Sequence, residues 1–190
     1  MFASLAVSSA AIFIAELGDK SQLMALAFTA RYRPWQVLLG ITLATTLVHA
    51  VSVGLGVTLG AALPGELVSL VAGLAFLGFA AWTLRGDALS DQDNRRARWG
   101  GPALLVVTLA FMLAELGDKT MLATVTLATQ HNWLGTWIGS TLGMVLADAL
   151  AIGIGLLVGK HVPKKAVQYG AAALFAVFGG WLVFEALQQL

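Results

Sequence analysis

Two identical strings of five residues carry the side chains of this chain that are best suited to chemistry. The string Glu-Leu-Gly-Asp-Lys occupies positions 16–20 and recurs, 99 positions later, at positions 115–119. Because the two acids of each string are three positions apart, an uninterrupted helix would place them on one face. Both strings lie in apolar stretches, where a charge at the centre of a bilayer costs about 2.5–3.5 kcal/mol on insertion scales. Charges retained twice at this cost predict a functional site.

The chemistry that suits these acids is the binding of a hard divalent cation. Four carboxylates brought together in a low dielectric would repel one another, and a divalent ion would relieve that repulsion. Carboxylate and carbonyl oxygens are the ligands that Mg²⁺, Ca²⁺ and Mn²⁺ prefer. A glycine between the acids of each string would let the helix loosen and free backbone carbonyls for the ion. We therefore predict a metal-ion site whose ligands are Glu16, Asp19, Glu115 and Asp118.

The lysines of the two strings allow a different interpretation. In each string the Glu and the Lys are four positions apart, in the order that favours an ion pair along a helix. The strings would then be polar clasps between helices, and Asp19 and Asp118 would be left uncompensated. We favour a division in which the acids bind the ion, while Lys20 and Lys119 position the helices and moderate the repulsion.

Further polar residues are candidates for supporting roles. Ser21, Thr120 and Gln22 directly follow the strings and offer neutral oxygens. His49 and Asp148 lie within apolar stretches and are again 99 positions apart. An intramembrane acid such as Asp148 would support the ligands or carry protons, and a histidine would shuttle protons near neutral pH. A simple packing role for His49 stays open.

The composition is that of an integral membrane protein. Of the 190 residues, 58% are hydrophobic and only 11% are charged, whereas soluble domains carry about 25% charged residues. The chain contains no cysteine, which excludes disulfides, zinc–thiolate sites, iron–sulfur clusters and cysteine nucleophiles. The formal net charge of +1 gives no reason to expect a nucleic-acid partner.

Six apolar stretches are long enough to span the hydrocarbon core, which takes about 20 helical residues. They lie near 4–30, 35–61, 66–84, 102–129, 133–159 and 165–187. We therefore predict an all-α integral membrane protein with six transmembrane helices, divided into a first three-helix repeat (1–84), a linker (85–101) and a second repeat (102–190). Because three is an odd number, the second repeat would have inverted topology. In transporters that architecture places the site near the bilayer midplane, between the repeats.

The basic residues predict the orientation in the membrane. Apart from the two motif lysines, every Lys and Arg falls in segments 31–34, 85–101 or 160–165. Cytoplasmic loops carry the excess of basic residues in membrane proteins. We therefore expect these three segments in the cytoplasm and both termini outside, with the bacterial cytoplasmic membrane as the location.

The paired E-x-G-D-K-[ST] strings, one in each half, resemble the motifs of a family of divalent-cation transporters. This family includes bacterial manganese exporters and the eukaryotic Golgi manganese/calcium transporters. The resemblance covers nearly the whole chain and implies exchange of Mn²⁺, with Ca²⁺ as a second candidate, for protons at the four motif acids. The family pattern commonly continues with Gln, as at Gln22, whereas the second copy here continues with Met121. A thioether ligand would suit Mn²⁺ better than Ca²⁺, and a packing role for Met121 stays open.

Other classes of protein would use the same features differently. A membrane-embedded lipid-phosphate hydrolase would want arginine beside its acids, and no arginine lies within a predicted span. A structural subunit would use the strings only for assembly. The nucleotide-binding string G-x-x-x-x-G-K-[ST] is absent from the sequence, which favours a carrier driven by ion gradients over a pump. We therefore expect a transporter rather than an enzyme, surrounded by membrane lipid and without a cofactor apart from the transported ion. The sequence does not predict whether the protein is a monomer or an oligomer.

Overall fold

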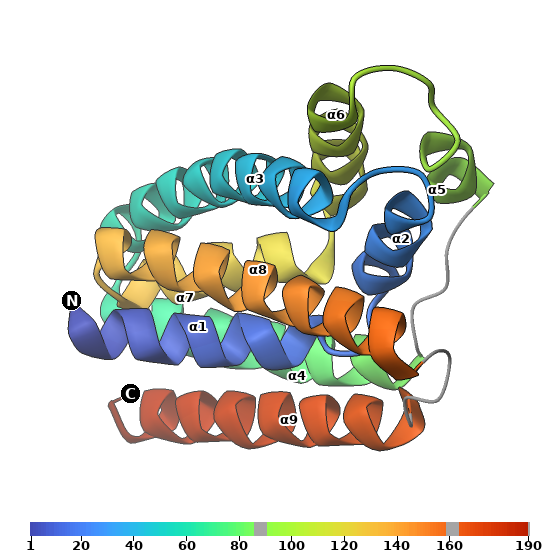
Figure 1. The fold of residues 1–190 in the computed structure, drawn as a ribbon. Helices are drawn as coiled ribbons and strands as arrows, with labels where there is room; N and C mark the ends of the chain where they lie inside the picture. Colours follow the sequence, from blue (N-terminus) through green and yellow to red (C-terminus); the bar gives the residue numbers. More distant parts are fainter. Residues whose placement is uncertain (86–90, 159–163, 190) are drawn as a thin grey trace.

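Helices make up nearly all of the computed structural model, which describes residues 1–85, 91–158 and 164–189. No strand occurs within these residues, so the predicted all-α fold is confirmed for the described part of the chain. Figure 1 shows the arrangement, in which the helix bounds are α1 (Phe2–Glu16), α2 (Lys20–Thr29), α3 (Pro34–Ala62), α4 (Gly65–Arg85), α5 (Asp91–Arg96), α6 (Ala103–Glu115), α7 (Lys119–Gln130), α8 (Trp133–Val158) and α9 (Lys164–Gln189).

Four helices of the described chain, α3, α4, α8 and α9, are each long and apolar enough to cross a membrane. A fifth crossing results if α1 and α2, which are bent by 75° at their junction, act as one span. Helix α6 has only 13 residues, which is about 20 Å of helix against the ~30 Å of a hydrocarbon core. The stretches predicted as single spans over 4–30 and 102–129 are each divided into two helices, and the count of six spans stays a prediction.

Helix α3 shows how the sequence separates a lipid-facing stripe from a packed one. The helix runs for 29 residues from Pro34, which is well suited to a first helical turn because it lacks an N–H. Leu39, Leu43 and Leu47 recur every four positions and are exposed, whereas small residues such as Ala44 are buried. An exposed leucine stripe opposite a buried small-residue stripe is the pattern of a helix that packs between lipid and protein.

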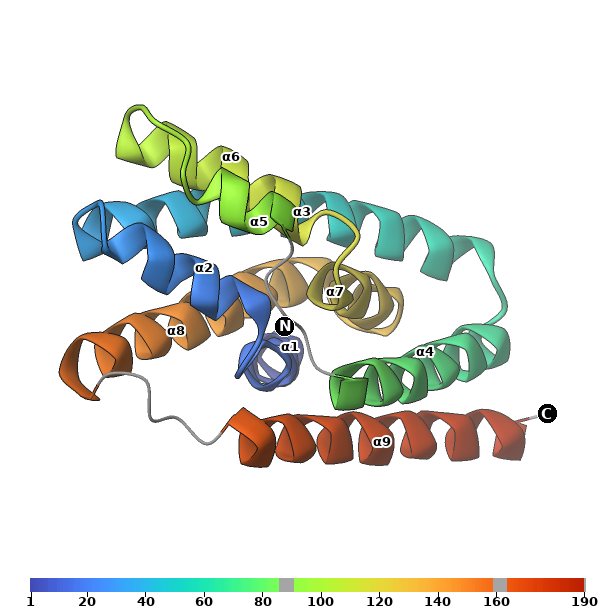
Figure 2. The ribbon, with the colours of Figure 1, turned by 90° about the vertical axis from the view of Figure 1, so that its right-hand side faces the viewer.

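The helices pack in pairs that come from different halves of the sequence. Helix α1 lies along α8 (Figure 1). Helix α4 lies along α9, and α3 contacts α6, α7 and α8 (Figure 2). Between α4 and α9, the ring of Phe76 meets that of Phe178 edge-on, with centroids 5.0 Å apart. This packing supports the short helices α1, α2, α6 and α7, whose ends meet in the interior.

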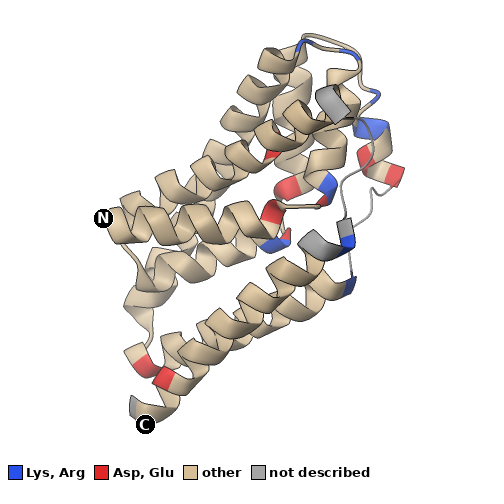
Figure 3. Cartoon of the chain, turned by 60° about the horizontal axis from the view of Figure 1, so that its bottom comes forward, with Lys and Arg blue, Asp and Glu red and all other residues tan. Residues whose placement is uncertain are grey.

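The charged residues divide between the ends and the interior of the molecule. Figure 3 shows Lys and Arg gathered mainly at the end away from the two termini, with a smaller group of charges midway.

Part of the predicted linker is helical (α5) and is held by hydrogen bonds to the loop after α2. Arg31 Nη1 donates to the carbonyl of Ala97 at 3.1 Å, and Tyr32 Oη donates to that of Gly101 at 3.2 Å. Lys160, in the segment 160–165 that is predicted to be cytoplasmic, lies outside the described residues.

Candidate metal-ion site

Both motifs lie at breaks between two helices. The first break separates α1 from α2 and the second separates α6 from α7. Gly18 and Gly117 have φ of +78° and +80°, a left-handed conformation that glycine adopts without steric cost. Asp19 and Asp118 occupy the N-cap positions of the following helices with almost the same backbone angles, φ −75°, ψ 168° and φ −76°, ψ 167°. The expected loosening at the glycines is confirmed. The expectation that each Glu and Asp share one helix face is wrong, because they belong to different helices.

The residues after each motif cap the glycine amide of the break. The N–H of Gly18 donates to Oε1 of Gln22 at 2.8 Å, and the N–H of Gly117 donates to Sδ of Met121 at 3.1 Å. Gln22 and Met121 therefore have the same structural role, although one offers oxygen and the other sulfur. Gln22 also donates from Nε2 to the carbonyl of Ala147 at 3.0 Å, which ties the first break to α8. A methionine cannot donate such a bond, so Met121 has no corresponding tie.

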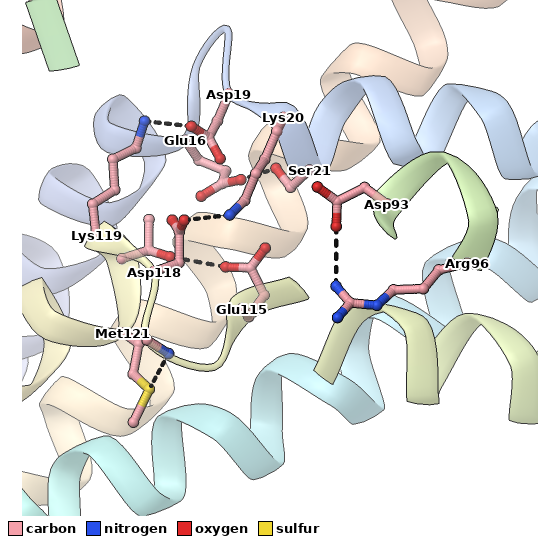
Figure 4. A network of polar contacts seen from close by, with 12 residues as sticks. Glu16, Asp19, Lys20, Ser21, Asp93, Arg96, Glu115, Asp118, Lys119 and Met121 are labelled. Atoms are coloured by element: carbon pink, nitrogen blue, oxygen red, sulfur yellow. Dashed lines mark hydrogen bonds and ion pairs between the residues drawn. The ribbon is translucent and has the colours of Figure 1, made fainter. Parts of the chain in front are cut away.

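The lysine of each motif pairs with the aspartate of the other motif. Lys20 Nζ lies 2.6 Å from Asp118 Oδ1, and Lys119 Nζ binds Asp19 Oδ1 in the reciprocal pair (Figure 4). The interpretation of Glu–Lys clasps within one helix is therefore wrong, and so is its consequence that both aspartates are uncompensated. The helix breaks explain the difference, because the i, i+4 spacing brings side chains together only along a continuous helix.

The two glutamates are bound by hydroxyl groups rather than by lysines. Ser21 Oγ donates to Oε1 of Glu16, and Thr120 Oγ1 donates to Oε2 of Glu115 at 3.0 Å. Both glutamates are at most 1% exposed. The second oxygen of each, Oε2 of Glu16 and Oε1 of Glu115, has no hydrogen-bond partner among the described residues. These two oxygens are available to a cation.

The other predicted polar positions, His49 and Asp148, are both buried, at 1% and 0% exposure. Asp148 interacts electrostatically with Asp19 and with both motif glutamates, so it belongs to the same acidic region. No described residue forms a hydrogen bond with Nδ1 of His49 or with either carboxylate oxygen of Asp148. The structure therefore places Asp148 near the acids, and no hydrogen bond or ion pair links His49 to them among the described residues.

The motif side chains of both halves converge on one interior region, as the prediction required (Figure 4). Among the described residues, however, no three His, Cys, Asp or Glu side chains are close enough together to hold an ion. The aspartates are bound by lysines and the glutamates by hydroxyls, so ion binding would require these side chains to rearrange. Sequence reasoning missed the carbonyl of Ala147, because a backbone acceptor carries no signal in the sequence.

Comparison with known proteins extends this description. A family model described as "Divalent cation/proton antiporter GDT1" matches residues 4–91 and 103–190. A protein of Vibrio cholerae serotype O1 named "Putative manganese exporter" is 38% identical over 128 residues, which cover 67% of this chain and 62% of that protein. "Protein PAM71, chloroplastic" of Arabidopsis thaliana is 28% identical over 202 residues, which cover 92% of this chain and 55% of that protein. The chain thus spans less than two thirds of either relative, and no solved structure matches it.

Proposed function

Because the chain belongs to the GDT1 family of divalent cation/proton antiporters, we propose that it exports Mn²⁺ from the cytoplasm in exchange for protons. The name of the Vibrio cholerae relative supports manganese as the metal. Ca²⁺ is the second candidate substrate, since carboxylates also suit that ion. The chain would act as two inverted three-helix repeats in the bacterial cytoplasmic membrane, with both termini outside.

The observation that carries this proposal is the meeting of two broken helices whose ends present buried acids. Glu16, Asp19, Glu115 and Asp118 are each at most 3% exposed. Broken helices are how membrane transporters bring polar backbone and charged side chains to an ion within the bilayer. An intramembrane acid is by default a sign of an ion or proton pathway.

The four acids would bind the ion in two steps. Glu16 and Glu115 would bind first, because neither forms an ion pair with a lysine among the described residues, whereas each motif aspartate does. A divalent ion then competes with the lysine ammonium groups for the oxygens of Asp19 and Asp118. Displaced lysines would leave all four carboxylates on the ion.

Proton exchange would follow from the same acids. A carboxylate buried away from water without a cation takes up a proton instead of keeping its charge. Departure of the ion would therefore be coupled to proton binding, and arrival of the ion to proton release. This gives antiport at one site without a separate proton channel.

Backbone-to-backbone packing at the end that holds the termini supports alternating access. A Cβ placed on Gly139 of α8 would lie 2.4 Å from the carbonyl oxygen of Leu5 in α1. A Cβ placed on Gly56 of α3 would lie 2.3 Å from the carbonyl oxygen of Val125 in α7. Only glycine permits helix backbones to approach so closely.

The matching positions toward the basic end are packed mainly by side chains. A Cβ on Gly155 would meet the side chain of Leu26 at 2.3 Å, and one on Gly40 would meet that of Val107 at 2.7 Å. Gly40 and Gly155 stand 99 positions from Gly139 and Gly56. This conformation would thus be closed at the end that holds the termini, and transport would exchange the two sets of contacts by rocking one half against the other.

Reconstitution tests the proposed function. Purified protein in proteoliposomes should move Mn²⁺ across the membrane and move protons in the opposite direction when no other energy source is present. A panel of Mn²⁺, Ca²⁺, Mg²⁺ and Zn²⁺ at equal concentration would rank the substrates. In cells, deletion should raise the manganese content and the sensitivity to manganese. Unchanged content and tolerance, with no flux in liposomes, would refute the proposal.

A further inference from the structure

Asp148 in α8 is a buried acid whose charge no contact in the described chain explains. The residue is 0% exposed, and neither of its carboxylate oxygens has a hydrogen-bond partner among the described residues. A charged group removed from water without a partner costs several kcal/mol. An acid at such a position is expected to have a partner in some functional form of the protein.

The surroundings of Asp148 place it at the first helix break. The residue before it, Ala147, accepts the hydrogen bond from Gln22 that ties this break to α8. The carboxylate interacts electrostatically with Asp19 and with both motif glutamates. Its missing partner would therefore lie within the same acidic region.

The lysines of the region are already bound elsewhere. Lys20 pairs with Asp118 and Lys119 pairs with Asp19. Glu16, Glu115 and Asp148 thus share two properties: none has an ion pair with a lysine among the described residues, and each has at least one buried oxygen without a hydrogen-bond partner there. Three such acids from three helices offer the oxygen ligands that a divalent cation takes. In this conformation no three acids of the described chain are close enough together to hold an ion, so the three side chains would converge when the ion binds.

We propose that Asp148 is a ligand of the transported divalent cation, and that it binds the ion together with Glu16 and Glu115 while the two aspartate–lysine pairs remain closed. This inference rests on the proposed function and adds a ligand from α8 to the motif acids. Opening of the pairs would then belong to a later step, in which the motif aspartates reach the ion.

The position of Asp148 makes the site unequal in its two halves. The residue 99 positions earlier is His49, which is equally buried but forms no hydrogen bond or ion pair with the acids among the described residues. The ion would therefore have a carboxylate from α8 and none from α3. With such an asymmetric ligand set, the site would present different ligands toward the two sides of the membrane. A chain with two identical repeats could not have this difference.

Metal binding to the purified full chain in detergent tests this inference. Titration calorimetry should show that Asp148→Asn binds Mn²⁺ at least about tenfold more weakly than the wild type, since even outer partners of a metal site are worth that much. The rise in melting temperature on adding Mn²⁺ should shrink in the same variant. Without metal its melting temperature should stay the same or rise, because an unpartnered buried acid is removed. Ser140→Ala is the matched control: Ser140 is also 0% exposed in α8, and its hydroxyl lacks a described partner.

The possible outcomes separate this inference from the proposed function. A wild-type protein that binds no Mn²⁺ would overturn both. A wild type that binds Mn²⁺ and an Asp148→Asn variant that binds it equally well would overturn the inference alone. If Asp148→Asn does not fold, Asp148→Glu decides, because it keeps the charge and moves the oxygens by one methylene. A changed Mn²⁺ affinity with wild-type stability of the metal-free protein would then support the role as ligand, and an unchanged affinity would overturn it.

Discussion

The Nζ atom of Lys20 lies 2.6 Å from Oδ1 of Asp118, so the lysine of the first motif neutralises the aspartate of the second. Lys119 and Asp19 form the reciprocal pair, and together the pairs tie the two helix breaks to each other. The pairs differ in their surroundings: the side chain of Lys20 is 20% exposed, and that of Lys119 is 5% exposed. Two motifs with the same sequence should therefore respond differently to the same substitution.

We expect Asp19→Asn to lower the free energy of unfolding more than Asp118→Asn. Removing one partner of a buried ion pair costs about 3–5 kcal/mol, because the other charge loses the partner that balanced it. Lys20 can turn its ammonium group toward its exposed side, whereas Lys119 is enclosed. Denaturant unfolding in detergent measures the difference. The double variant Asp19→Asn/Lys119→Met should recover most of the loss, and equal losses in the two single variants would contradict this account.

Glu16→Gln and Glu115→Gln should each reduce Mn²⁺ transport at least about tenfold while the protein stays folded. Each change keeps the shape of the side chain and removes one charge, and neither glutamate has a lysine partner in the described structure that would be stranded. Asp19→Asn and Asp118→Asn should also abolish transport, but they unbalance an ion pair as well. Flux in proteoliposomes is the measurement. Asp91→Asn, in the exposed part of α5, is the control, and native flux in either glutamine variant would exclude that acid as an essential ligand.

The sequence predicts the ends of the long helices well because long apolar runs alone decide where a helix can lie in a bilayer. The spans expected at 35–61 and 133–159 correspond to α3 (Pro34–Ala62) and α8 (Trp133–Val158). The site itself is predicted only as a set of residues. The partner of Lys20 depends on how the two breaks face each other, and that arrangement has no counterpart in the spacing of a single helix. The capping role of Met121 is likewise visible only once the backbone of Gly117 is known.

Apparent Mn²⁺ affinity should weaken as the pH falls, because protons and the metal ion compete for the same carboxylates. Binding of the ion should release protons, and its release should take them up. A pH-sensitive dye inside proteoliposomes, read together with metal flux, checks both signs. Because the acids interact, the profile would report values for the cluster rather than for single residues. An affinity that stays constant from acid to neutral pH, without proton movement, would indicate a uniporter or channel.

His131, which follows α7, should make the protein less stable at mildly acid pH. Burial lowers the pKa of its imidazole below the usual value of about 6.5, and its Nε2 has no hydrogen-bond partner in the described structure. The folded protein then binds fewer protons than the unfolded chain, so stability is lost as the pH falls below about 6.5. Melting temperatures from pH 8 to pH 5 should decline more steeply for the wild type than for His131→Gln. Parallel curves would show that the imidazole is equally accessible in both states.

Gly139→Ala should open the end of the molecule that holds the termini, because its methyl group would lie 2.4 Å from the carbonyl oxygen of Leu5. Gly54→Ala is the matched control, since a Cβ there would meet no atom within 4 Å. The chain has no cysteine, so a single Thr136→Cys at this end of α8, where Thr136 is 0% exposed, can report access. A membrane-impermeant maleimide should label this cysteine slowly in the wild-type background and with Gly54→Ala, and faster with Gly139→Ala, which should also transport Mn²⁺ more slowly. Equal labelling and equal transport in all three backgrounds would show that the contact between α1 and α8 does not close the pathway.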